Sequence, residues 1–71
     1  MITFEELRQG MIDAEATGMA GRGAYGPDLK RCAYWYVGDY IIIHLTDDVD
    51  FDARMLTEDM MDNLIIVRKI E

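Results

Sequence analysis

The sequence contains little of what small proteins ordinarily use to reinforce a small core. It has one cysteine, Cys32, and one histidine, His44, so no disulfide can form within the chain and these residues alone cannot build a tetrahedral zinc site. A single domain of 71 residues buries only about 60% of the surface that its unfolded chain exposes. We therefore expect marginal stability, with oligomerisation or partner binding as the remaining means of stabilisation.

Long apolar stretches are also missing. No uninterrupted apolar run approaches the roughly 20 residues that a membrane-spanning helix requires. Residues 1–6 lack the basic region and apolar stretch of a signal peptide, and an unpaired cysteine fits a reducing compartment. The sequence therefore predicts a soluble protein of the cytoplasm.

Basic residues are scarce relative to acidic ones. The chain has 7 lysines and arginines against 14 aspartates and glutamates, a formal charge of −7. Such a charge repels phosphate backbones and anionic lipids, so we expect no direct contact with nucleic acid or membrane. Hydrophobic residues make up 51% of the chain, enough to offset the ordering entropy of folding. We expect residues 1–71 to form a single small acidic domain.

A helix is predicted over residues 3–17. Thr3 followed by Glu6 has the spacing of a capping box, and apolar residues recur behind it at helical intervals. Gly18 is a suitable stop. Gly10 weakens the middle of such a helix by about 1 kcal/mol relative to alanine, so tertiary packing has to stabilise it.

The next segments predict a loop and a hairpin. Residues 18–28 contain four glycines and the only proline, which favours a loop. Residues 30–37 and 40–46 are rich in β-branched and aromatic side chains and flank Gly38-Asp39, a two-residue turn signal. We expect these two segments to pair as an antiparallel hairpin.

The last third of the chain predicts a helix and a strand. The apolar spacing over residues 53–63 suits a short second helix, and residues 64–70 are rich in β-branched side chains. The order helix, strand, strand, helix, strand predicts an α+β fold. We expect a small three-stranded antiparallel-type sheet with two helices on one face.

Both faces of the predicted hairpin are apolar. With Gly38-Asp39 as the turn, Trp35 opposes Ile42 on one face. The opposite face is interpreted as the core face, and it carries Cys32, Tyr34, Tyr36, Ile41, Ile43 and Leu45. Two short helices can cover only one side, so the face with Trp35 is left over.

Two interpretations of the remaining face are open. In one, the glycine-rich segment folds across it and buries Trp35. In the other, Trp35, Tyr40 and Ile42 form a self-association surface, because tryptophan and tyrosine are enriched where interfaces derive their energy and contiguous exposed patches mark contacts. The second interpretation predicts a structural or regulatory homodimer without enzymatic activity.

Motifs for catalysis or cofactor binding are weak. Residues 21–26 have the letters of the dinucleotide fingerprint, but they follow a predicted helix and precede a hairpin instead of linking a strand to a helix. Strand alternation places Cys32 and His44 on opposite faces, which disfavours a thiol and imidazole pair. We expect no enzymatic activity, no catalytic residue and no cofactor.

Half of the acidic residues gather within residues 47–62. They are Asp47, Asp48, Asp50, Asp52, Glu58, Asp59 and Asp62. Asp48, Asp50 and Asp52 are spaced like the first, third and fifth ligands of a calcium loop. The sixth position of such a loop needs glycine, and here it is Ala53. We therefore interpret the stretch as a solvated acidic turn and predict no metal site.

The same stretch has a second, functional interpretation. In an extended chain alternate side chains lie about 6.6 Å apart on one side, so Asp48, Asp50 and Asp52 would form a row with Val49 and Phe51 turned inward. This spacing is of the order of the charge repeat of a nucleic-acid strand. Such a row can occupy a basic surface by electrostatic complementarity, whereas the alternative is a solvated face whose acids suit a helix N-terminus.

Small size, acidity and the lack of a catalytic motif together resemble, in composition, the small phage proteins that inhibit host nucleic-acid-binding machinery. Inhibitors of CRISPR systems are among them. The resemblance involves no shared motif, so no residue role is transferred. It implies a small acidic protein-binding module, an anti-CRISPR-like inhibitor or decoy that occupies the nucleic-acid-binding surface of a larger protein. The seven acidic residues of 47–62 are its predicted contacts.

Overall fold

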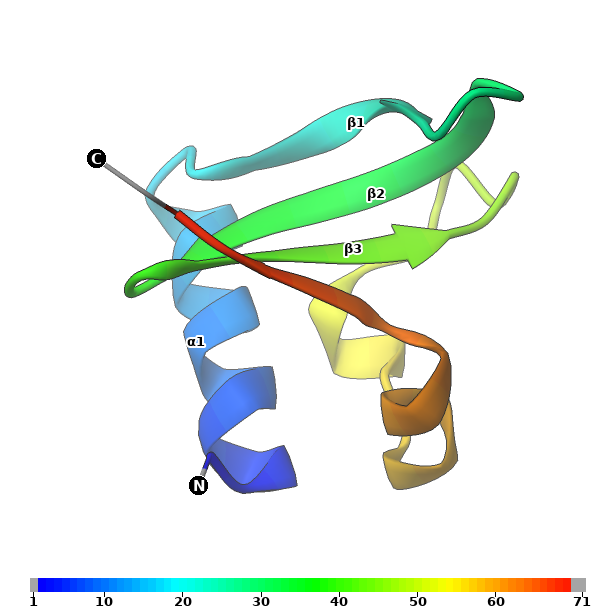
Figure 1. The fold of residues 1–71 in the computed structure, drawn as a ribbon. Coiled ribbons are helices and arrows are strands. Elements are labelled where there is room, and N and C mark those ends of the chain that lie inside the picture. Colours follow the sequence, from blue (N-terminus) through cyan, green and yellow to red (C-terminus); the bar gives the residue numbers. More distant parts are fainter. Residues whose placement is uncertain (1, 70–71) are drawn as a thin grey trace.

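Residues 2–69 fold into one α-helix, two short 3₁₀ helices and a four-stranded antiparallel sheet (Figure 1). This arrangement is given by a computed structural model, which describes residues 2–69. Each strand pairs with the next one along the sequence, in the order β1-β2-β3-β4. The predicted α+β class is confirmed, but the sheet has four strands where the sequence predicted three.

Helix α1 (Phe4–Ala16) is the predicted first helix, one residue shorter at each end. The capping box is present, because the Glu6 N–H donates to Thr3 Oγ1 and the Thr3 N–H donates to Glu6 Oε1, both at 3.1 Å. Gly18 follows the helix with φ +76°, a left-handed conformation that favours glycine at a helix end. The buried side chains of the helix are Leu7, Met11 and Ala14.

Gly10 lets α1 lie close against the sheet. A Cβ atom at this position would lie 2.6 Å from Cγ1 of Val37. Real carbon atoms do not approach so closely, so any larger residue would push the helix away from β2. The weak helix propensity of glycine is therefore the cost of close helix-to-sheet packing.

Strand β1 (Ala20–Tyr25) replaces the predicted loop. It pairs along its whole length with β2, and Gly21 lies opposite Tyr34. A Cβ atom on Gly21 would lie 2.6 Å from Tyr34 Oη, so the tyrosine ring occupies the space that a side chain would need. Glycine has low strand propensity in general, and this prediction was wrong because the glycines serve cross-strand packing.

The central hairpin is confirmed residue by residue. Strands β2 (Lys30–Val37) and β3 (Tyr40–Leu45) pair in the predicted register, with Trp35 opposite Ile42. Gly38 in the connecting turn has φ +58°, which glycine adopts without steric cost.

The predicted second helix is wrong. Two short 3₁₀ helices, η1 (Ala53–Met55) and η2 (Glu58–Asn63), occupy this part of the chain. Leu56 interrupts them with an extended backbone at φ −66° and ψ 131°, and its side chain is buried. A continuous helix would require helical backbone angles at Leu56, and the side chain would then leave its buried position in the core.

Strand β4 (Ile65–Arg68) lies within the predicted terminal strand, which is confirmed over these residues. It pairs with β3, and Ile66 lies opposite Ile42. Residue 70, the predicted end of the strand, lies outside the described residues.

The core lies between α1, η1 and one face of the sheet (Figure 1). Its buried members are Leu7, Met11, Ala14, Ala33, Trp35, Ile42, Phe51, Ala53 and Leu56. The core face of the hairpin was predicted wrongly, since the face with Trp35 is the covered one. Both faces are apolar in sequence, so alternation alone did not distinguish them.

Candidate functional site

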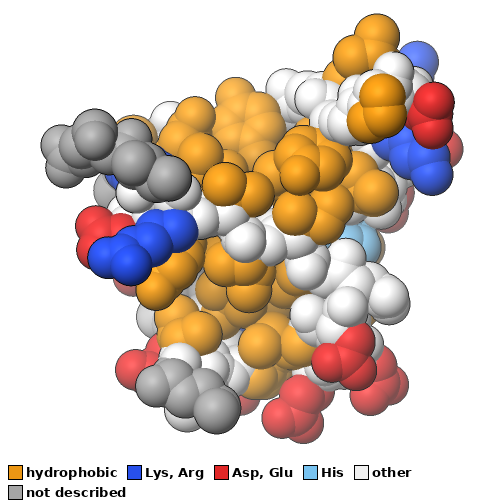
Figure 2. Space-filling view, in the orientation of Figure 1, with side chains coloured by type: hydrophobic (Ala, Val, Ile, Leu, Met, Phe, Trp, Pro, Cys, Tyr) orange, Lys and Arg blue, Asp and Glu red, His pale blue; other side chains and the backbone are white. Residues whose placement is uncertain are grey.

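The face of the sheet opposite α1 is not covered by any helix of the described chain (Figure 1). We call it the open face. Strand alternation and register place the following residues on it: Met19, Gly21, Gly23, Tyr25, Lys30, Cys32, Tyr34, Tyr36, Ile41, Ile43, Leu45, Ile65 and Val67. Lys30, at one end, is the charged residue of this set and none of the set is acidic, and Figure 2 shows hydrophobic side chains gathered over the strands.

An exposed row crosses β2, β3 and β4 near the Gly38 turn and continues to Met19, the residue before β1. Tyr36 pairs with Ile41, which pairs with Val67, and the Tyr36 N–H donates to the Met19 carbonyl at 2.9 Å. Met19, Tyr36 and Val67 are all exposed large hydrophobic residues. The row therefore offers apolar contact area to a partner.

Tyrosine rings shape the open face. The Tyr34 ring lies over Gly21 and Gly23 of β1, in the space that side chains at these positions would need. The rings of Tyr34 and Tyr36 meet edge to face, with centroids 5.8 Å apart and an interplanar angle of 80°. Lys69 Nζ lies 5.7 Å from the centroid of the Tyr36 ring, a cation–π arrangement.

The predicted self-association residues lie on the covered side of the sheet. Trp35 and Ile42 are only 2% and 1% exposed, because α1 and its neighbours cover them. Because their side chains belong to the core, the prediction that they form a surface patch was wrong. Tyr40 is 40% exposed.

An apolar cleft of about 290 Å³ lies beside α1 on the covered side. Tyr40 and Ile42 contribute to its wall together with Ile66 of the edge strand. The remaining lining residues are Ile2, Leu7 and Val37. It is thus lined by hydrophobic side chains and one tyrosine hydroxyl.

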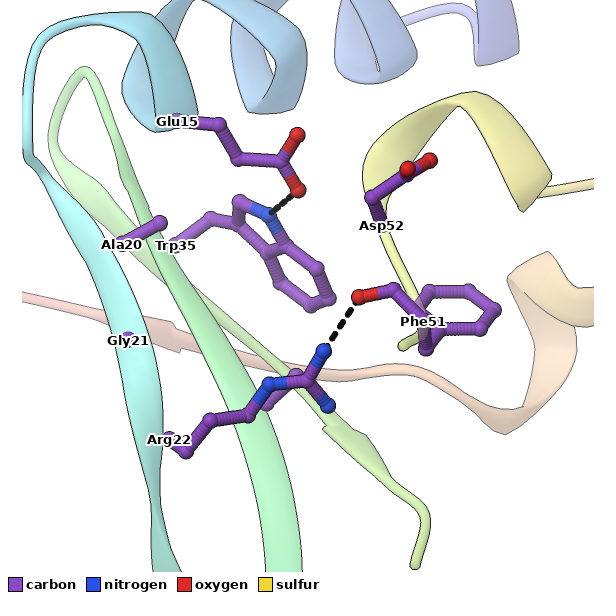
Figure 3. A pocket seen from close by; sticks show the side chains of 8 residues that line it. Glu15, Ala20, Gly21, Arg22, Trp35, Phe51 and Asp52 are labelled. Atoms are coloured by element: carbon purple, nitrogen blue, oxygen red, sulfur yellow. Dashed lines mark hydrogen bonds between the residues drawn. The ribbon is translucent and has the colours of Figure 1, made fainter. Parts of the chain in front are cut away.

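A polar pocket of about 270 Å³ lies between α1, β1 and the loop before η1 (Figure 3). Glu15 Oε2 accepts hydrogen bonds from Trp35 Nε1 and from the Ala53 N–H, both at 2.8 Å. One carboxylate therefore connects the helix, the sheet and the η1 segment. Asp52 also lines the pocket.

Arg22 fixes the other side of this pocket. Its guanidinium donates to the carbonyl oxygens of Asp48 at 2.8 Å, Val49 at 3.2 Å and Phe51. The Phe51 contact is visible in Figure 3. Because this guanidinium and the Glu15 carboxylate both bond to the protein's own backbone, the pocket is best explained as the attachment of loop 46–52 to the sheet.

His44 is the only histidine, and its surroundings favour the neutral form. Its ring stacks on Phe51 with centroids 4.5 Å apart, and its buried Nδ1 has no hydrogen-bond partner within residues 2–69. Burial, and to a lesser extent the nearby Arg22, lower the pKa of His44. The His44 side chain is half-buried.

Cys32 and His44 lie on opposite faces of the sheet, as predicted, since His44 pairs with Ala33 in the register. Cys32 is buried, also as predicted. The thiol and the imidazole therefore cannot act as a nucleophile and base pair.

The acidic residues are exposed, but the predicted row of aspartates is not formed. The Asp48 and Asp52 carboxylates accept hydrogen bonds from the N–H groups of Asp50 and Arg54, both at 2.9 Å, so each closes a local turn. Val49, expected to turn inward, is 75% exposed. The exposed acidic residues are Asp47, Asp48, Asp50, Asp52, Glu58, Asp59 and Asp62.

The inward direction of Phe51 is confirmed, since its side chain belongs to the core. Within residues 2–69, no group of three or more histidine, cysteine, aspartate or glutamate side chains is placed to hold a metal ion. In the same part of the chain, no helix has the length and apolar character needed to cross a membrane.

Comparison with known proteins adds no assignment. No protein-family model, curated protein or solved structure matches this chain. The functional argument therefore depends on the surfaces described above.

Proposed function

We propose that this chain is a protein-binding module without catalytic activity, and that the open face is its contact surface. The observation that supports the proposal is a continuous, mostly apolar surface without an acidic residue on one side of a chain that has 14 aspartates and glutamates. Contiguous exposed apolar patches mark interaction sites, and tyrosine is enriched at the centres of interfaces.

Site-specific photo-crosslinking tests this function. A photoreactive phenylalanine analogue replaces Tyr36 on the open face, and in a matched control it replaces Val49, which is more exposed but lies on the acidic loop. Irradiation in lysate of the source cells should yield crosslinked protein species from position 36 and few from position 49. A chain that crosslinks equally from both positions, or from neither, contradicts the proposal.

A second candidate function is the acidic inhibitor or decoy. It is supported by the 3₁₀ helix η2, which has no buried residue and exposes Glu58, Asp59 and Asp62. Exposed carboxylates attract a basic surface through long-range electrostatics.

Charge reversal tests this second function. The double variant Asp59→Lys with Asp62→Lys should lose proteins that the wild-type chain captures from lysate at low salt. Glu5→Lys with Asp13→Lys on α1 is the control with the same change in charge. If both double variants capture the same proteins as wild type, η2 is not the contact.

A further inference from the structure

We propose that the partner of the open face is a second copy of this chain, packed sheet against sheet. The inference depends on the proposed function of the open face and names its occupant. Three features of the described residues support it: the size of the face, the placement of charge around it, and its apolar composition.

The size of the open face suits a weak dimer. Neighbouring strands lie about 4.8 Å apart and successive residues on one side lie about 6.7 Å apart, which gives a flat footprint of about 20 by 19 Å, or roughly 400 Å². The raised side chains add accessible area to this footprint, but a standard interface takes about 800 Å² from each partner. The face therefore predicts a weak, transient dimer below the standard interface size.

Charge placement favours contact through this face over any other. The chain has a net charge of −7, so two copies repel one another wherever their acidic surfaces meet. The open face has no acidic residue, and lysines lie at its ends: Lys30 beside Tyr25, and Lys69 beside Tyr36. Two copies that meet through it keep the acidic η2 segments away from the contact.

Each end of the open face also carries an acidic partner for a lysine. Asp28 lies in the turn before Lys30, and the Asp39 carbonyl accepts a hydrogen bond from the Lys69 N–H at 2.7 Å. Both ends thus combine one lysine with one aspartate. In a two-fold dimer the same surface meets itself, and lysines of one copy can pair with aspartates of the other whichever ends coincide.

The composition of the face is compatible with sheet packing. Two sheets pack about 10 Å apart when side chains from both fill the layer between them. The Tyr34 ring covers Gly21 and Gly23, and the exposed side chains of Tyr36 and Val67 lie in the neighbouring row. In a two-fold dimer the tyrosine and aliphatic side chains of both copies would fill the layer between the sheets.

Sedimentation of the purified full chain tests the inference. Wild type is measured from about 1 to about 100 μM, the range in which a Kd of micromolar order is resolved. Val67→Asp places a carboxylate within the face, and Leu45→Asp does so on a neighbouring strand. Val49→Asp is the control, with the same chemical change on the exposed acidic loop. Circular dichroism confirms that each variant is folded.

We expect wild type and Val49→Asp to form dimers, and Val67→Asp and Leu45→Asp to weaken dimerisation about tenfold or more, since a carboxylate buried in an apolar layer carries a large desolvation cost. A wild-type chain that stays monomeric at the highest concentration overturns the inference. So does a dimer that both face variants leave intact.

Failure of the dimer inference can be distinguished from failure of the proposed function. A monomeric wild type that still crosslinks to other proteins through position 36 leaves the protein-binding function standing and removes only the second copy. Binding of a fluorescent single-stranded oligonucleotide that Val67→Asp abolishes assigns the tyrosine face to base stacking instead, and it overturns both proposals.

Discussion

At the scale of single residues, Glu15 makes the most demanding contacts of the described chain. Its carboxylate accepts from groups 20 and 38 residues away in sequence, Trp35 Nε1 and the Ala53 N–H. These donors are held at the edge of the core, where a lost acceptor leaves them poorly solvated. A pairing of this kind is not readable from the sequence, because it depends on how three segments meet.

Glu15→Ala should lower the free energy of unfolding by about 2 kcal/mol, because it leaves two donors without their acceptor. Urea denaturation measures the change. Asp13→Ala is the control, because the Asp13 carboxylate accepts from the exposed Gln9 side chain and its removal should cost less than about 0.5 kcal/mol. Equal effects of the two substitutions would show that the hydrogen bonds of Glu15 do not contribute to the free energy of unfolding.

Arg22 stabilises the loop that precedes η1. Arg22→Ala removes hydrogen bonds to three carbonyl groups and should destabilise the protein by about 2 kcal/mol, since bonds from charged donors are the stronger ones. Hydrogen exchange of amides 46–52 should accelerate. Arg8→Ala, which removes a single bond to the Arg54 carbonyl, should have the smaller effect on both measurements.

His44 predicts a dependence of stability on pH. Its pKa is lowered below the ordinary 6.5 by burial and by Arg22, so the folded state binds the proton less tightly than the unfolded state. The resulting stability is complete above about pH 6.5 and is lost as pH falls below that value toward the folded pKa. Glu6 acts in a lower window, because its hydrogen bonds with Thr3 lower its pKa below 4.5.

Urea denaturation of wild type and His44→Gln between pH 7.5 and pH 5 measures this dependence. The difference in free energy of unfolding between the two proteins should shrink as the pH falls through about 6.5. A difference that is constant over this range would exclude a role for His44 titration.

At the scale of elements, the sequence predicted those whose signals are local. The capping box of α1 and the Gly38 turn each depend on a few neighbouring residues, and both are confirmed together with the hairpin register. The elements missed depend on distant contacts. Strand β1 uses glycines that make room for Tyr34, and the 3₁₀ segments are separated by Leu56, whose side chain enters the core.

The contact between Gly10 and Val37 is testable at this scale. Gly10→Ala should destabilise the fold although alanine favours helix, because its Cβ would lie 2.6 Å from Cγ1 of Val37. A double-mutant cycle with Val37→Ala should show a coupling of about 1 kcal/mol, with the alanine at position 10 tolerated better once the valine is shortened. Additive effects would mean that α1 does not depend on this approach.

At the scale of the whole molecule, the candidate surface could be found from the sequence only in part. Alternation defined the two faces of the hairpin correctly, and it indicated that one of them is left over. Alternation did not indicate which face α1 covers. Trp35 and Tyr36 lie on opposite faces, and either is suited to a core. The acidic row failed because Asp48 and Asp52 bond to local N–H groups.

A small domain with one uncovered sheet face should gain stability from association. If the chain dimerises as proposed, its melting temperature should rise with protein concentration, because binding between folded copies stabilises the folded state. Val67→Asp should show a smaller rise in melting temperature over the same concentration range. Calorimetry at two concentrations a hundredfold apart measures this difference, and a concentration-independent wild type would contradict it.

The position of Trp35 gives the molecule a built-in optical reporter. It is the only tryptophan of the chain, its indole N–H is bonded to Glu15, and its ring lies within the core, edge to face with Phe51 at a centroid distance of 6.2 Å. The fluorescent side chains of the open face are all tyrosines. Tryptophan emission should therefore shift when the core opens and stay constant when the sheet face is covered, so that unfolding and association can be followed separately in one unlabelled sample.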